Sequence, residues 1–310
     1  MSYVIGLDVG GSTVKAGVFN GSSQSFGDIR LKTYSSKNTR EEIITNMATA
    51  VRQLMEQARG LRIGQLAGIG IGVPGFVNSR DGVVMHASNL SLHNVNLKQW
   101  FEEEFSVPCV VQGDARVGAL AEREFGAAKG RDSLLYVVIG TGVGSGMILD
   151  GKVYEGVHSV AGEIGHTIVQ PDGNICACGK RGCLETLVSG PMLIRAYQRR
   201  VGPQEITAKT LSERATAGEP DAVAVFRQAA QDLAFALSNY CTILDPSIVV
   251  IGGGVSLAGP VLFEPLREFF SVYASALASR SIKIVPAQLG DRSGVVGASL
   301  LVKEFLANTD

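Results

Sequence analysis

The chain has 310 residues, enough for two ordinary domains with large buried cores. Its 28 basic and 29 acidic residues nearly cancel and no basic run stands out, so we expect no nucleic-acid partner. The opening stretch MSYVIGLDVG lacks the basic start of a signal peptide, and no apolar run reaches membrane-spanning length. With an odd number of cysteines, five in all, these features predict a cytoplasmic protein in a reducing compartment.

The N-terminal part of the chain is predicted to open with a β-hairpin. Apolar residues precede a Gly-rich turn at Gly10 and Gly11, and an alternating stretch follows it. Residues 41–60 show the apolar spacing of a helix, and residues 66–75 read as a strand that closes on a turn. A further apolar strand, residues 109–111, leads directly into a helical pattern.

The second part of the chain repeats this plan. Residues 134–149 again read as strand, Gly-rich turn and strand, and a long helix over 221–244 again precedes a strand that ends in glycines, SIVVIGGGVS. A helix over 294–306 closes the chain. The repeat predicts a duplicated α/β fold with two domains and a cleft between them.

We expect a small α/β domain over residues 1–115, joined by the C-terminal helix at about 294–310. The larger α/β domain, 116–293, carries the cysteine cluster. Three segments are predicted to be surface loops: 20–28, 78–84 and 202–220.

Asp114 stands at the junction of a predicted strand and a predicted helix. A carboxylate there can cap the first turn of the helix by accepting backbone N–H groups. It can also serve chemistry, because strand-to-helix junctions of α/β enzymes often carry functional carboxylates. The local sequence leaves both roles open.

Three Gly-rich turns could bring backbone N–H groups close to an anion. None fits a dinucleotide fingerprint, because a strand rather than a helix follows Gly140, and no GxxxxGK[ST] loop is present. Hydroxyl side chains accompany two of the turns. The turns are Asp8–Thr13, Gly140–Gly144 and Gly252–Gly254.

Residues 163–185 carry a metal-binding pattern, EIGHTIVQPDGNICACGKRGCLE. Three thiols and one imidazole match a closed tetrahedral zinc site whose ligands are His166, Cys176, Cys178 and Cys183. The H-x-E and P-C-x-x-C spacings of zinc deaminases are missing, and four protein ligands leave no position for water. The predicted zinc is therefore structural.

These motifs together resemble a known family. In this order, DVGGST, GTGVG and IGGG resemble the two phosphate segments and the adenosine segment of the actin-like ATPase superfamily. GH followed by CxCGxxGCxE is similar to the signature of the ROK family, the zinc-containing bacterial sugar kinases and their repressor relatives. VPG at 73–75, NL at 89–90, GDA at 113–115 and AGEIGH extend the resemblance over nearly the whole chain.

The resemblance implies ATP-dependent phosphorylation of a hexose hydroxyl, the 6-OH, with Asp114 as general base. ATP with Mg²⁺ would bind in the interdomain cleft, and Asp8 would act near Mg²⁺ through water. His166 would serve both zinc and sugar. The implied nucleotide-binding residues are Asp8, Gly10, Gly11, Ser12, Thr13, Thr141, Gly142, Gly253 and Gly254. The implied sugar-binding residues are Gly75, Asn89, Asp114, Glu163, His166 and Glu185.

The chain departs from the family pattern around Asp114. Gly113 and Arg116 stand where the family usually has asparagines, and the first of these asparagines normally binds sugar hydroxyls. The stretch NLSLHNVNL, with His93, also departs from the family's usual substrate loop. We therefore expect that the preferred substrate is not plain glucose, or not glucose alone. Allose, another epimer and an N-acylated hexosamine all remain open.

Two other functions remain as alternatives to a kinase. One is a sugar-binding or regulatory ROK protein without turnover, which Gly113 favours. The other is a chaperone-like or filament-forming ATPase, which would not need the zinc cluster. ROK repressors carry an N-terminal helix-turn-helix, whereas this sequence opens with a strand, which favours the kinase. A homodimer or tetramer is implied only by the family.

Overall fold

The computed structural model describes residues 2–11, 13–20, 25–32, 39–87 and 90–308. The chain forms two compact units. Unit 1 comprises Met1–Ala121, Glu155–Ala161 and Asp291–Asp310, and unit 2 comprises Glu122–Tyr154 and Gly162–Gly290. The division expected from the sequence differs in placing 116–121, 155–161 and 291–293 in the larger domain.

The main sheet of unit 1 has five strands in the order β3-β2-β1-β4-β8. β1, β2 and β3 pair antiparallel, whereas β1, β4 and β8 run parallel. The strands are β1 (Ser2–Val9), β2 (Thr13–Asn20), β3 (Ser25–Lys32), β4 (Gln65–Val73) and β8 (Cys109–Gly113).

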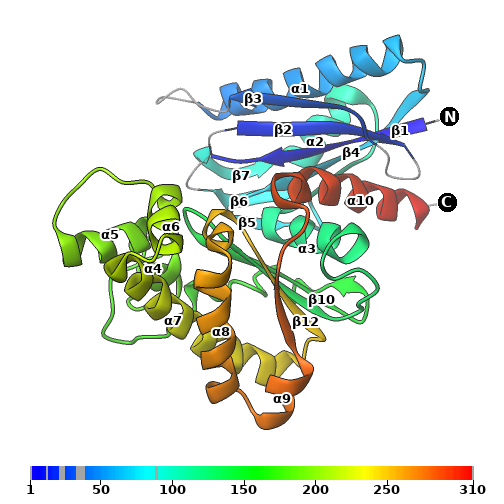
Figure 1. Cartoon of the computed structure of the whole chain (residues 1–310). Coiled ribbons are helices and arrows are strands. Elements are labelled where there is room, and N and C mark those ends of the chain that lie inside the picture. The colour runs from blue at the N-terminus through cyan, green and yellow to red at the C-terminus, as the bar shows by residue number, and fades with distance from the viewer. Residues whose placement is uncertain (1, 12, 21–24, 33–38, 88–89, 309–310) are drawn as a thin grey trace. The chain divides into compact units, whose positions relative to one another are not determined.

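Helices cover both faces of this sheet. α1 (Arg40–Gly60) packs on β2 and β3, and α10 (Ser293–Ala307) packs on β1 and β4 from the opposite face (Figure 1). α1 begins at a capping box, because the Thr39 hydroxyl accepts from Glu42 N while the Glu42 carboxylate accepts from Thr39 N. α2 (Leu97–Phe105) packs on β8, and α3 (Asp114–Phe125) follows β8 directly.

Unit 1 also contains a small antiparallel sheet that the sequence did not predict. Its strands are β5 (Phe76–Asn78), β6 (Val83–Ala87) and β7 (Leu92–Asn96), in that order.

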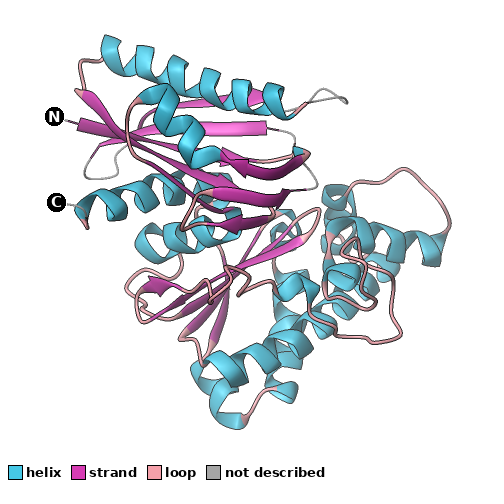
Figure 2. Cartoon of the chain, turned by 180° about the vertical axis from the view of Figure 1, so that it is seen from behind, coloured by secondary structure: helices cyan, strands magenta, loops and turns pink. Residues whose placement is uncertain are grey.

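The sheet of unit 2 repeats the strand order and directions of the unit 1 sheet. Its order is β11-β10-β9-β12-β13, with the first three strands antiparallel and β9, β12 and β13 parallel. Figure 2 distinguishes the strands (magenta) from the helices (cyan). The strands are β9 (Leu134–Ile139), β10 (Val143–Leu149), β11 (Lys152–Val153), β12 (Ile248–Gly252) and β13 (Lys283–Pro286). The predicted mixed α/β class is confirmed.

The helices of unit 2 follow its sheet strands or pack on one another. α7 packs along α8, and α6 contacts α7. The helices are α4 (Glu185–Val188), α5 (Gly190–Val201), α6 (Ala208–Thr216), α7 (Pro220–Leu244), α8 (Pro260–Tyr273) and α9 (Ala276–Ser281). None of the helices among the described residues combines the length and apolar character needed to cross a membrane.

The loop predictions were wrong in part. Ser25–Lys32 is an edge strand whose outer positions are exposed, so it lacks the apolar run that signals a buried strand. Helix α6 lies inside the segment expected to be the loop 202–220, and it begins where the Thr207 hydroxyl accepts from Thr210 N. In the segment 78–84, Asn78 ends β5 and Val83 begins β6.

Helix α10 meets the central strands of unit 1 at van der Waals distance between backbones. A Cβ placed on Gly70 would lie 1.8 Å from the carbonyl oxygen of Ala298, and one on Gly6 would lie 2.3 Å from that of Val295. On the helix itself, a Cβ on Gly297 would lie 1.7 Å from the carbonyl oxygen of Val117 in α3. Glycine at these positions therefore sets how closely the helix approaches the sheet and α3.

We expect Gly70→Ala to destabilise the protein by about 3 kcal/mol or more, because backbone atoms, which cannot move aside cheaply, would clash with the new methyl group. Chemical denaturation measures the change. Gly60→Ala is the control, because no atom lies within 4 Å of a Cβ at Gly60. Equal stability of the two variants would contradict the close-packing argument.

Candidate active site and metal centre

Four side chains of unit 2 form a candidate metal centre. The ligand atoms of His166, Cys176, Cys178 and Cys183 all lie within 4.8 Å of one another. Cys176 Sγ lies 3.6 Å from His166 Nδ1, and Cys178 Sγ lies 3.6 Å from Cys183 Sγ. Two thiolates on a tetrahedral zinc ion lie about 3.8 Å apart, because each Zn–S bond is about 2.3 Å. The four residues therefore fit zinc.

The chain around these ligands is irregular and depends on short backbone contacts. Cys176 N donates to Lys180 O at 2.7 Å, and Gly182 N donates to Asn174 O at 2.8 Å. Gly182 has φ +77°, and a Cβ there would lie 1.6 Å from the carbonyl oxygen of Gln170. A glycine is therefore required where the knuckle folds back on the preceding segment.

Glu185, the first residue of α4, connects the metal centre with the second Gly-rich turn. One carboxylate oxygen accepts from Val143 N at 3.0 Å, and the other accepts from the Cys176 thiol at 3.7 Å. A Cβ on Gly142 would lie 2.5 Å from the carboxylate, so glycine makes room for this contact. Glu185 was predicted to bind sugar, and the structure places it against a predicted phosphate-binding turn of the same unit.

Glu163 and His166 flank the short 3₁₀ turn Ile164–His166. His166 N donates to Glu163 O at 3.1 Å, which closes the turn. Since Nδ1 of His166 faces Cys176, Nε2 lies on the other side of the ring. This geometry is compatible with the predicted double role of His166 toward metal and sugar.

The second and third Gly-rich turns meet at one end of the unit 2 sheet. A Cβ on Gly253 would lie 2.3 Å from the carbonyl oxygen of Ile139, the last residue of β9. Gly254 opens a 3₁₀ turn, and nothing lies within 4 Å of a Cβ placed there. Thr141 is exposed in the turn after β9. The predicted nucleotide residues of unit 2 are thus brought together.

In unit 1, Asp114 is the first residue of α3 and follows the last strand of the sheet, β8. Its Oδ1 accepts from Ala115 N at 2.7 Å. The side chain is thus bonded to the backbone of the next residue at the helix start, and it is half-buried. It lies at the carboxyl end of a parallel strand, where α/β proteins bind their ligands.

Asp8 lies in β1 beside the first Gly-rich turn. Its carboxylate packs against Gly294 at the start of α10, because a Cβ on Gly294 would lie 2.4 Å from Asp8 Cγ. Lys15 Nζ lies 3.6 Å from the Asp8 carboxylate and 3.6 Å from that of Asp291. Burial raises the pKa of Asp8, and the neighbouring Lys15 ammonium opposes this shift only in part.

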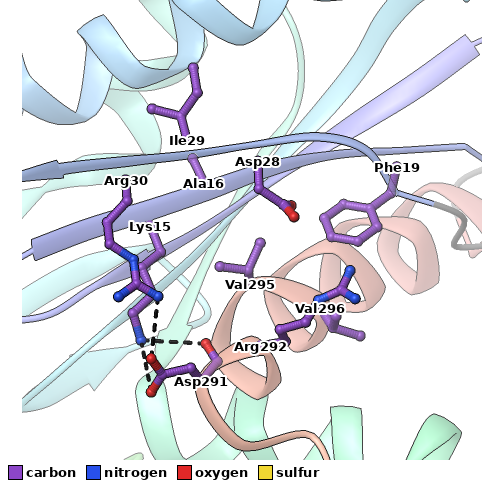
Figure 3. A pocket seen from close by; sticks show the side chains of 10 residues that line it. All are labelled: Lys15, Ala16, Phe19, Asp28, Ile29, Arg30, Asp291, Arg292, Val295 and Val296. Atoms are coloured by element: carbon purple, nitrogen blue, oxygen red, sulfur yellow. Dashed lines mark hydrogen bonds and ion pairs between the residues drawn. The ribbon is translucent and has the colours of Figure 1, made fainter.

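Sequence reasoning missed Lys15 and Asp291. The hairpin register was the available signal for Lys15, because a tight turn at Gly10 and Gly11 sets residue 15 opposite Asp8. Asp291 lies 276 residues after Lys15 in the chain, so no local sequence pattern indicated that the two side chains meet. Figure 3 shows Lys15 and Arg30 directed at Asp291 on one wall of a cavity of about 140 Å³ in unit 1. Val295 and Val296 of α10 line its apolar side.

The remaining predicted site residues are placed as follows. Gly10 N donates to Thr13 O at 2.8 Å and closes the first turn around Gly11. Gly75 has φ +94°, and a Cβ there would lie 2.2 Å from the carbonyl oxygen of His86. The Nδ1 atoms of His86 and His93 lie 3.0 Å apart across β6 and β7. Ser12 and Asn89 lie outside the described residues.

Comparison with known proteins assigns the chain to a family. The model of the ROK family matches residues 4–305, so the chain belongs to the ROK family, as its motifs predicted. A glucokinase of Halalkalibacterium halodurans is 34% identical over 97% of this chain and 95% of its own. A xylose repressor of Caldicellulosiruptor bescii is 28% identical over 96% of this chain and 77% of its own.

A solved structure is similar over the same extent. The ROK family glucokinase from Streptomyces griseus, in complex with glucose and AMPPNP, has a TM-score of 0.83 and 32% identity to this chain. The similarity covers 96% of this chain and 98% of that one.

We expect Cys178→Ser to lower zinc affinity by at least roughly 100-fold and to lower the melting temperature, because one thiolate of a four-ligand site is lost. Zinc content after dialysis and thermal unfolding measure both effects. Cys241→Ala, at a buried thiol outside the cluster, is the control and should keep its zinc. A zinc-free Cys178→Ser protein as stable as the parent would contradict the structural role.

We expect Asp8→Asn to raise the melting temperature at pH 7 by about 2–4 °C. The folded-state pKa of Asp8 lies above the unfolded value, so the ionised carboxylate lowers stability at neutral pH. As the pH falls toward the unfolded pKa the penalty disappears, and the gain from the substitution should shrink. Lys15 keeps Asp291 as a partner in the variant.

Thermal unfolding from pH 5 to 8 checks this expectation. Asp132→Asn, at a side chain 83% exposed, should change nothing over the same range. An Asp8→Asn protein less stable than the parent at pH 7 would contradict it.

Proposed function

We propose that this protein is an ATP-dependent sugar kinase that transfers the γ-phosphoryl group to a hexose hydroxyl, the 6-OH, with Asp114 as general base. The observation that carries the proposal is the similarity, over nearly the whole of both chains, to ROK glucokinases. One of these holds glucose together with AMPPNP, which is a chemical analogue of ATP. The reaction would take place in the cytoplasm.

The proposed phosphoryl transfer has three requirements, and residues of this chain can meet each of them. Phosphoryl transfer needs the phosphates held in position, their charge neutralised and a carboxylate that accepts the proton of the attacking hydroxyl. Asp114, at the carboxyl end of β8, suits the last role because its Oδ1 is already anchored to the start of α3.

The nucleotide would be held by backbone N–H groups of the Gly-rich turns, as in actin-like ATPases. It would bind in the cleft that the sequence predicts. The residues predicted to hold it are Gly10, Gly11, Ser12 and Thr13 from the first segment, Thr141 and Gly142 from the second, and Gly253 and Gly254 from the third. Mg²⁺, bound with ATP, would supply neutralising charge, and the carboxylate of Asp8 would orient its water ligands.

The sugar would be held by carboxylates, which accept hydrogen bonds from vicinal hydroxyls. Glu163 and Glu185 would supply these carboxylates, His166 would add an imidazole nitrogen, and Gly75 and Asn89 would line the substrate loop. Zinc on His166, Cys176, Cys178 and Cys183 would brace this segment. Because Glu185 also accepts from Val143 N, sugar contacts and the second phosphate-binding turn would share one side chain.

A second candidate function is sugar binding without turnover in a regulatory protein. The match to xylose repressors over nearly all of this chain favours it, as does Gly113 in place of the family's asparagine. The two candidates differ in one measurable quantity, the release of ADP in the presence of sugar.

We expect Asp114→Asn to lower kcat by roughly 100-fold or more, because general-base catalysis contributes roughly 10²–10⁴-fold. Sugar affinity, measured by calorimetry, should change little. The test is ADP release against a panel of hexoses, N-acetylhexosamines and ketoses, with parent and variant compared on each sugar. Near-normal turnover of the variant would reduce Asp114 to a helix cap. Sugar binding by a parent protein that shows no turnover would favour the regulatory candidate.

A further inference from the structure

Arg116 is a buried arginine in the first turn of α3, two residues after Asp114. Its side chain is 4% exposed. One terminal nitrogen donates to Ser159 O at 2.8 Å and to Ala161 O at 2.9 Å, and the other donates to Gln112 Oε1 at 3.1 Å. Among the described residues, no carboxylate lies within ion-pair distance of this guanidinium. A buried charge supported by carbonyl groups is costly, so its retention calls for a specific use.

The segment that Arg116 holds is the irregular loop Glu155–Ala161, part of unit 1. Ala161 N donates to Glu155 O at 3.0 Å, which closes the loop on itself. Little of it is buried: Val157 is 91% exposed, and Ser159 has φ +56°. The position of this loop therefore rests on side-chain tethers rather than on a core.

A second tether holds the start of the same loop. The Glu155 carboxylate accepts from Gln112 Nε2 at 2.6 Å and from the Ser79 hydroxyl. Gln112 thus contacts both Arg116 and Glu155, and it immediately precedes Gly113 and Asp114. Strand β8 and the first turn of α3 hold both ends of the loop.

Gly113 and Arg116, the two departures from the family pattern, are also neighbours in space. A Cβ on Gly113 would have a single neighbour within 4 Å, Arg116 Cδ at 3.9 Å. The space that an asparagine side chain would enter from position 113 is bordered by the stem of Arg116.

We infer that Arg116 is a positioning residue for sugar recognition. By fixing the carbonyl of Ala161, its guanidinium sets where the chain stands two residues before Glu163. The helix that begins with Asp114 therefore also fixes the end of the loop that leads along the chain to Glu163. This inference rests on the proposed function, in which Glu163 binds the sugar and Asp114 the reacting hydroxyl. Arg116 replaces the lost asparagine pair by orienting the backbone instead of contacting the sugar.

The test compares Arg116→Met, Arg116→Lys and the parent on the preferred sugar. Methionine keeps an unbranched apolar stem and loses every donor, whereas lysine keeps one charge that can reach one carbonyl. Arg116→Met should raise KM for the sugar at least tenfold and change KM for ATP less than twofold. Arg116→Lys should fall between parent and Arg116→Met. The order of kcat/KM among hexose epimers should also change in Arg116→Met.

Arg267→Met is the matched control, because Arg267 likewise donates to the backbone, with two N–H groups on the carbonyl of Ile284 in unit 2. It should leave KM for the sugar and the order of epimers unchanged. Hydrogen exchange in Arg116→Met should accelerate over residues 157–163 and remain unchanged in the strands of the unit 1 sheet.

An unchanged sugar KM in folded Arg116→Met, or equal increases in KM for sugar and ATP, would overturn the positioning role. Because the parent would still be a kinase in that case, the proposed function would survive. A parent protein that neither binds nor phosphorylates any hexose would overturn the proposed function and this inference together.

Discussion

The metal ligands are the constraint on which the sugar-binding part of the proposed site depends. Residues 163–185 contain one 3₁₀ turn and two isolated β-bridges, and the apolar side chains of Ile168 and Ile175 in this segment are exposed. Segments that bury little apolar surface need a cross-link to hold one conformation. Four ligand atoms within 4.8 Å supply the geometry for that cross-link. Glu163, His166 and Glu185 are all carried on this segment, so a metal there would fix a binding surface rather than take part in chemistry.

In unit 1, a charged side chain, Asp8, lies beside the closely packed contact between α10 and the sheet. Glycines let α10 approach the sheet backbone, and the same approach leaves Asp8 largely buried against the first turn of that helix. Burial raises the pKa of Asp8, the Lys15 ammonium lowers the cost of ionising it, and the carboxylate of Asp291, which also pairs with Lys15, adds to that cost. A carboxylate kept in such a place at the expense of stability is typical of a functional position.

Local patterns predicted most of the fold and much of the candidate site. The hairpins, α1, α7, α10 and the strand β8 were visible because apolar spacing reports which positions a regular element buries. The edge strand β3, the small sheet β5–β7 and helix α6 were missed, because half-exposed or short elements lack that spacing. The cysteine cluster was predicted since its four ligands lie within 18 residues and need no distant partner.

The sequence by itself determined the family and the mixed α/β class and predicted the candidate site residues, because these depend on motifs whose parts are close in the chain. Only the tertiary structure decided the partners of those residues. Glu122, part of a helical pattern, is fully buried and accepts from Gln288 N and Leu289 N, which are 166 and 167 residues away. The sequence showed Arg116 only as a replacement of the family's usual asparagine. In the structure, its guanidinium donates to backbone carbonyls 43 and 45 residues away. Such contacts are made by packing between elements, and the periodicity of one element carries no information about which other element will meet it.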